Sequence, residues 1–120
     1  MSRRISFTKL ENELIRSFRD KINTAATAED IASAFTRTMD KLVAGAMGES
    51  TPDAREGITF EPKAKDFYRL DDGLASNASF TDIMDASDLP QIISRFAGTA
   101  NRRRRRILEH RERTEAKIRN

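Results

Sequence analysis

Cysteine is absent from this 120-residue sequence, and His110 is its only histidine. Without cysteine, neither a disulfide framework nor a thiolate metal site can form. A single histidine cannot build a histidine metal cluster. In this basic setting, with no carboxylate placed to orient it, it is also a poor partner for a serine nucleophile. The sequence therefore predicts a protein without a metal or cofactor, and one that is not an enzyme.

Long apolar runs and glycine-rich phosphate loops are absent as well. No stretch of about 18 apolar residues could span a membrane, and the basic N-terminal segment lacks the unbroken apolar core of a secretory signal. Neither GxxxxGK followed by Ser or Thr nor GxGxxG occurs, so two common nucleotide-binding loops are excluded. A chain without cysteine fits a reducing compartment, and we expect a cytoplasmic protein that does not enter membranes.

A row of aspartates is the nearest approach to a metal site. Asp82, Asp85 and Asp88 are three residues apart, and on one continuous helix their carboxylates could hold Mg²⁺ or Ca²⁺. However, Asp88 is better placed to cap a helix, and the segment lacks the glycine and the terminal glutamate of an EF-hand loop. We therefore predict no metal site here.

The charge is unevenly distributed along the chain. Residues 101–120 carry nine basic side chains against three glutamates, which gives +6, whereas the first hundred residues carry thirteen against sixteen, which gives −3. A localised charge produces a local field that the net charge of +3 conceals. The functional question therefore concentrates on the C-terminal segment.

The N-terminal half has the pattern of two helices. A helix over about 9–22 is predicted by apolar residues every four positions and by a capping box formed by Thr8 and Glu11. A second helix is predicted to start at a cap formed by Thr27 and Asp30 and to stop at Gly48. Its apolar stripe consists of Ile31, Phe35, Met39, Leu42, Val43 and Met47. The two helices should form an antiparallel hairpin.

The middle segment is less regular. Residues 58–60 and 67–70 suit two strands of a short β-hairpin. The alternative is an irregular segment whose aromatic side chains plug the helical core, and the sequence does not choose between them. Residues 71–73 read as a turn, and 79–87 have room for one helical turn.

A third helix is predicted from a cap at Asp88, paired with Gln91, to about residue 119, with Gly98 as the one place where it could bend or stop. Five consecutive residues of a helix spread over more than a full turn, so the arginines at 102–106 cannot share one face. We therefore expect one compact domain over 1–100, ending near Ala100, and a basic helical extension over 101–120.

If the third helix is continuous, its apolar stripe is centred about 150° from Arg102. The stripe is formed by Leu89, Ile93, Phe96 and Ala100. Ile107 and Ile118 continue it, and Thr114 lies near it. A seam this thin could pack against a partner helix or a second copy, but it could not form a core alone.

A different face of this helix carries a basic ridge within about 60° of arc. The ridge consists of Arg102, Arg106, Arg113 and Lys117. No glutamate lies inside that arc, although Glu109 borders it. No aromatic residue follows Phe96, so any nucleic-acid contact should be to phosphates rather than stacked bases.

The basic helix has three interpretations. Mixed Arg/Glu helices are often only solvated surfaces, but an acid-free ridge can also follow a phosphate backbone or dock into an acidic protein groove. We predict a mainly α protein that acts as a small non-enzymatic binding module and contacts anionic partners, with nucleic-acid phosphates as the leading candidate. The alternative is a protein-interaction or self-assembly module that pairs through Ile107, Thr114 and Ile118.

Overall fold

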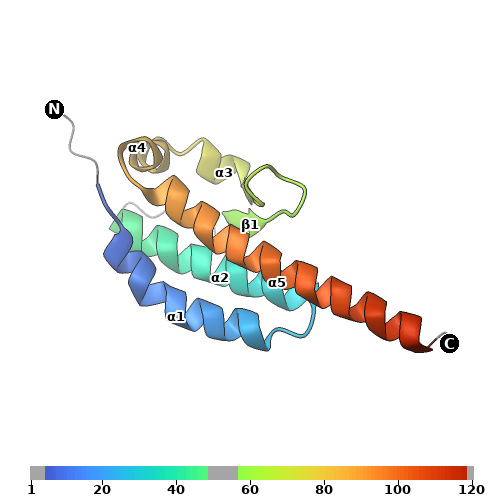
Figure 1. The fold of residues 1–120 in the computed structure, drawn as a ribbon. Coiled ribbons are helices and arrows are strands. Elements are labelled where there is room, and N and C mark those ends of the chain that lie inside the picture. Colours follow the sequence, from blue (N-terminus) through green and yellow to red (C-terminus); the bar gives the residue numbers. More distant parts are fainter. Residues whose placement is uncertain (1–4, 49–56, 119–120) are drawn as a thin grey trace.

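The computed structural model describes residues 5–48 and 57–118, and for 111–118 it describes the course of the helix without the side chains. In chain order the elements are α1 (Thr8–Thr24), α2 (Ala28–Met47), β1 (Ile58–Phe60), β2 (Tyr68–Leu70), α3 (Asp72–Ala75), α4 (Ala78–Ala86) and α5 (Leu89–Ile118). The chain is mainly helical and ends in a long C-terminal helix, as predicted, and the middle segment, for which two alternatives were open, contains a short antiparallel sheet (Figure 1).

The N-terminal helices α1 and α2 pack together and run in opposite directions (Figure 1). The capping box predicted for α2 is present: the Thr27 hydroxyl accepts from the N–H of Asp30 at 3.1 Å, and the Asp30 carboxylate accepts from the N–H of Thr27 at 3.3 Å. The predicted apolar stripe of α2 is buried throughout. The helix ends at Gly48, whose φ of 56° lies in the left-handed region that glycine tolerates best.

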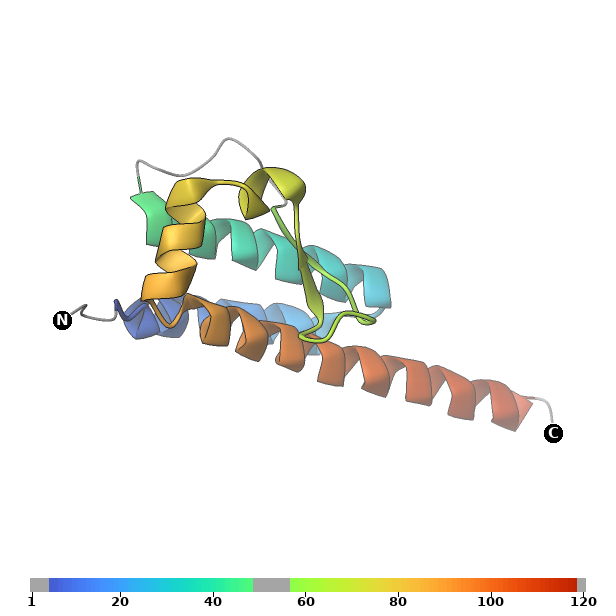
Figure 2. The same ribbon diagram turned by 90° about the horizontal axis from the view of Figure 1, so that it is seen from above.

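The middle segment forms the β-hairpin rather than an irregular plug. β1 and β2 pair antiparallel, with Thr59 opposite Arg69 and Phe60 opposite Tyr68. Tyr68 is partly buried and packs against the core, whereas Arg69 is exposed, which is the alternation expected of a sheet with one covered face. Figures 1 and 2 show the hairpin lying over α2 and reaching toward α5.

Helical structure between the hairpin and α5 is more extensive than the sequence indicated. Asp71 accepts a hydrogen bond from the N–H of Gly73 and so begins the short α3, where a turn was predicted. Asn77 accepts from the N–H of Phe80 at 2.9 Å and caps α4, which has nine residues rather than one turn. Phe80 is fully buried, so packing against the core stabilises a helix whose sequence pattern is too short to be recognised.

The core lies where α5 crosses α1 and α2. Phe18 of α1 and Phe96 of α5 are both fully buried, and their rings meet edge to face with centroids 4.9 Å apart. Phe35 of α2 makes a similar contact with Phe60 of β1 at 5.9 Å, which fixes the hairpin to the helices. Among the described helices, none has an apolar stretch long enough to cross a membrane.

The start of α5 is fastened to the N-terminal segment. Ile5 bonds through its N–H to the carbonyl of Ala86 and through its carbonyl to the N–H of Asp88. The Asp88 carboxylate accepts from the N–H of Phe7 at 2.8 Å and from the hydroxyls of Ser6 and Thr8. Asp88 therefore precedes α5 as predicted, but its carboxylate binds the N-terminal segment.

Two predicted side-chain caps are consequently wrong. Gln91 is exposed and does not form the expected pair with Asp88. The residue that caps α1 is Phe7, which makes no side-chain capping bond, and Glu11 does not reach back toward Thr8. Glu11 instead accepts two hydrogen bonds from Arg95 of α5, at 2.7 and 2.9 Å. Long-range partners have displaced local ones, because a guanidinium binds a carboxylate more strongly than one backbone N–H does.

Candidate anion-binding surface

The candidate surface lies on α5, which is one continuous helix. The helix runs from Leu89 to Ile118 without interruption at Gly98, and open space surrounds the position where a Cβ would stand on that glycine. No neighbouring side chain therefore interrupts α5 at Gly98. Its last turns project beyond the ends of the other helices, which gives the molecule its length of 64 Å against 27 and 24 Å (Figures 1 and 2).

The two described residues of the predicted ridge are both exposed. Arg102 donates a hydrogen bond to the hydroxyl of Thr99 at 3.2 Å, one turn earlier, and Arg106 lies one turn later. Within the described part of the chain, neither guanidinium forms an ion pair with a carboxylate. Both charges are therefore available to an external anion. The side chains of Arg113 and Lys117 lie outside the described residues.

Arg103 has a structural role that the sequence did not reveal. Its guanidinium donates to the carbonyls of Ile22, Asn23 and Ala25, at 3.2–3.3 Å, where α1 ends. The last carbonyls of a helix lack intrahelical partners and carry its partial negative charge, so a cation is stabilising there. One arginine of the run thus closes the C-terminus of α1 and is not available to a ligand. Its only sequence signal was its position near the buried stripe.

The remaining described positions of the run differ from one another. Arg104 is half-buried, whereas Arg105 is exposed and has no ion-pair partner in the described part of the chain. Ile107, predicted as an interface residue, is 8% exposed and belongs to the core of its own chain. Packing of α5 onto the body therefore extends past the boundary expected near Ala100. The side chains of Thr114 and Ile118, the other proposed interface positions, are not described.

The ion pair that α5 forms in the described part of the chain is between Arg95 and Glu11, near the start of the helix, and not among the five consecutive arginines at 102–106. The hydrogen bonds that Arg95 donates to Glu11 raise the pKa of its guanidinium, so this charge is permanent and internally satisfied. Arg95, like Arg103, therefore binds α1. Among the residues that the structure describes, the arginines of α5 without a carboxylate partner begin at Arg102. The available cations of α5 are concentrated in its second half.

No other described cluster offers obvious chemistry. Among the described residues, no group of three or more histidine, aspartate or glutamate side chains is arranged to hold a metal ion. An open hollow of about 320 Å³ lies between α2 and β1, lined chiefly by small and hydroxyl side chains with Arg37 and Asp40.

Comparison with family models, with curated proteins and with solved structures finds no match to this chain.

Proposed function

We propose that this chain is a small non-enzymatic binding protein whose basic C-terminal helix contacts nucleic-acid phosphates. One observation carries the proposal. Arg102 and Arg106 are exposed, one turn apart, on a continuous helix, and neither is neutralised by a carboxylate in the described part of the chain. Unpaired guanidiniums in a row are suited to successive phosphates, because each can donate two parallel hydrogen bonds to phosphate oxygens.

The ordering of charges along α5 supports the same conclusion. Arg95 and Arg103 are occupied by Glu11 and by the carbonyls at the end of α1, so they position the helix. In the described part of the chain, Arg102, Arg105 and Arg106 form no ion pair and do not cap a helix end. An arginine needed only for solubility could equally be lysine, whereas arginine is preferred where phosphate is bound.

The proposal is tested with the double variant Arg102→Gln/Arg106→Gln. Binding to random-sequence duplex DNA across a salt series should weaken, and the slope of log K against log salt should flatten by about 0.9 for each phosphate that the variant no longer neutralises. The matched control is Lys9→Gln/Lys41→Gln, which removes the same two charges from exposed positions on α1 and α2. Equal effects of the two variants would indicate binding by net charge alone, and wild-type protein that fails to bind even at low salt would refute the proposal.

A self-assembly or protein-interaction module is the alternative, favoured by the projection of α5 beyond the other helices (Figure 1). Because Ile107 is buried within its own chain, a partner would have to cover the helix beyond that residue. Light scattering at micromolar concentration decides this point: a mass well above 13.6 kDa that falls when residues 111–120 are removed would favour assembly.

A further inference from the structure

The tip of the β-hairpin presents a second pair of basic side chains. Lys63 and Lys65 are exposed in the turn between β1 and β2. The turn is held by backbone hydrogen bonds from Ala64 to the carbonyl of Glu61 and from Phe67 to the carbonyl of Ala64, each at 3.1 Å. The Glu61 carboxylate also accepts from the backbone N–H of Lys63. The two lysines therefore project from a turn of defined shape.

Phe67, at the end of this turn, has an unusual backbone conformation. Its φ of 68° lies in the left-handed region, which is costly for a bulky residue. Its side chain is partly buried and packs against the core, and its carbonyl accepts from the N–H of Glu61 at 2.9 Å. Backbone strain of this kind persists only where the surroundings enforce it, and it is concentrated at functional sites. Here it fixes the direction in which the tip leaves the body.

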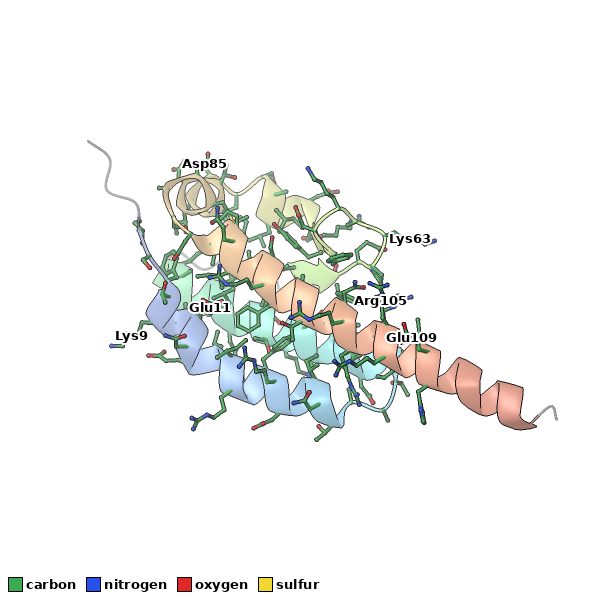
Figure 3. The ribbon with its side chains drawn as sticks, in the orientation of Figure 1. Lys9, Glu11, Lys63, Asp85, Arg105 and Glu109 are labelled. Carbon is green, nitrogen blue, oxygen red and sulfur yellow. The ribbon has the colours of Figure 1, made fainter. Side chains whose placement is uncertain are left out.

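The hairpin lies beside the middle of α5. Tyr68, the first residue of β2, is partly buried and packs against the core, and its phenol lies close enough to Ser94 of α5 for that side chain to lower its pKa. Partial burial raises the pKa of Tyr68, the charge of Asp66 adds to this, and the phenol therefore stays neutral at neutral pH. Figures 1 and 2 agree in placing the turn next to α5, and Figure 3 shows Lys63 and Arg105 on the same flank of the molecule.

The balance of charge on this flank favours an anion. Lys63, Lys65 and Arg105 form no ion pair in the described part of the chain. The carboxylates nearby are those of Glu61, which is engaged by the turn, and of Asp66 and Glu109, which are exposed. Three unpaired cations on two separate elements thus face solvent beside the exposed arginines of α5.

We propose that the hairpin tip is a second contact element of the phosphate-binding surface, with Lys63 and Lys65 binding phosphates of the same duplex that α5 engages. This inference rests on the proposed function and adds a second group of residues that contacts the same ligand. Two basic elements projecting from different parts of the body fit successive phosphates of a nucleic-acid backbone, not one small phosphate ion. Lysine also binds phosphate, as a compact point charge, although without the bidentate geometry that arginine supplies on α5.

The test compares the double variant Lys63→Gln/Lys65→Gln with Arg102→Gln/Arg106→Gln and with the control Lys9→Gln/Lys41→Gln. Lys9 and Lys63 lie on opposite sides of the helical body (Figure 3). The probe is random-sequence duplex DNA in a salt series, and the thermal midpoint of each variant verifies folding. We expect the hairpin variant to flatten the slope of log K against log salt by about 0.9 for each phosphate left without its lysine, and the control to leave the slope nearly unchanged.

The possible outcomes separate this inference from the proposed function. If the arginine variant weakens binding while the hairpin variant matches the control, the second contact element is refuted and the function of α5 stands. If wild-type protein does not bind the duplex at low salt, both proposals fail. If inorganic phosphate at millimolar concentration competes as well as duplex DNA of equal phosphate content, the surface binds single anions and the inference is refuted.

Discussion

The two halves of α5 have the same secondary structure but opposite relations to the rest of the molecule. In the first half, Asp88 binds the N-terminal segment, Arg95 binds Glu11, and Phe96 packs against Phe18. The last turns of α5 extend beyond the other helices (Figure 2). Asp88 and Arg95 at the start of α5 thus bind the body, whereas Arg105 and Arg106 farther along are exposed and form no ion pair in the described part of the chain.

The five-arginine run lies across the transition between these halves. Arg103 closes α1, Arg104 is half-buried, and Arg102, Arg105 and Arg106 are exposed. A charge run on a helix is therefore not one functional unit, because the 100° turn per residue distributes neighbouring positions between the body and the solvent. The same residue type stabilises the fold at one position and is available to bind at the next.

The largest difference between the halves should appear on truncating their apolar side chains. Phe96→Ala should lower the free energy of unfolding by about 3–5 kcal/mol, because it removes a fully buried ring and leaves a cavity beside Phe18. Leu108→Ala, at a half-buried position directly after Ile107, should cost much less. Urea denaturation measures both, and equal costs would show that the second half is packed as firmly as the first.

A smaller effect should separate two neighbouring arginines. Arg103→Gln should lower the free energy of unfolding by about 1–2 kcal/mol, because three carbonyls at the end of α1 lose a charged donor. Arg105→Gln should change it by less than about 0.5 kcal/mol, as is usual for an exposed side chain. Duplex binding should show the reverse order. Identical stability of the two variants would contradict the role of Arg103 as a helix cap.

The smallest effect is a pH dependence at the start of α5. Burial raises the pKa of the Asp88 carboxyl, but hydrogen bonds from the N–H of Phe7 and from the hydroxyls of Ser6 and Thr8 outweigh it, so the pKa is lowered on folding. Its stabilising contribution is therefore present above the unfolded pKa of about 3.9 and is lost as the pH falls through the folded value.

This contribution is measured as the difference in unfolding free energy between wild type and Asp88→Asn. The difference should be constant from about pH 5 to pH 7 and should shrink below about pH 4. Asp85→Asn, at an exposed position on α4, is the control for the removal of one carboxylate from this region. A difference that stays constant down to about pH 2 would show that the hydrogen bonds of Asp88 do not depend on its charge.

Local patterns in the sequence predicted the elements well because the relevant interactions are local. Thr27 and Asp30 are three residues apart and bond to each other, and the stripe of α2 follows the period of one helix. The β-hairpin was one of two open alternatives, and packing of Phe60 against Phe35 favours it over the other. The length of α4 was underestimated because Phe80 obtains its stabilisation from the distant core.

The sequence by itself determined that the protein is mainly helical, that its positive charge is concentrated at the C-terminus, and that arginines must surround the last helix. Only the tertiary structure decided which of those arginines are occupied. Glu11 could have paired with Thr8 or with Arg95, and Arg103 could have faced solvent or the end of α1. Such choices depend on which groups the packing of α1 against α5 brings within hydrogen-bond distance, and partners some 80 residues apart leave no periodic signal in the chain.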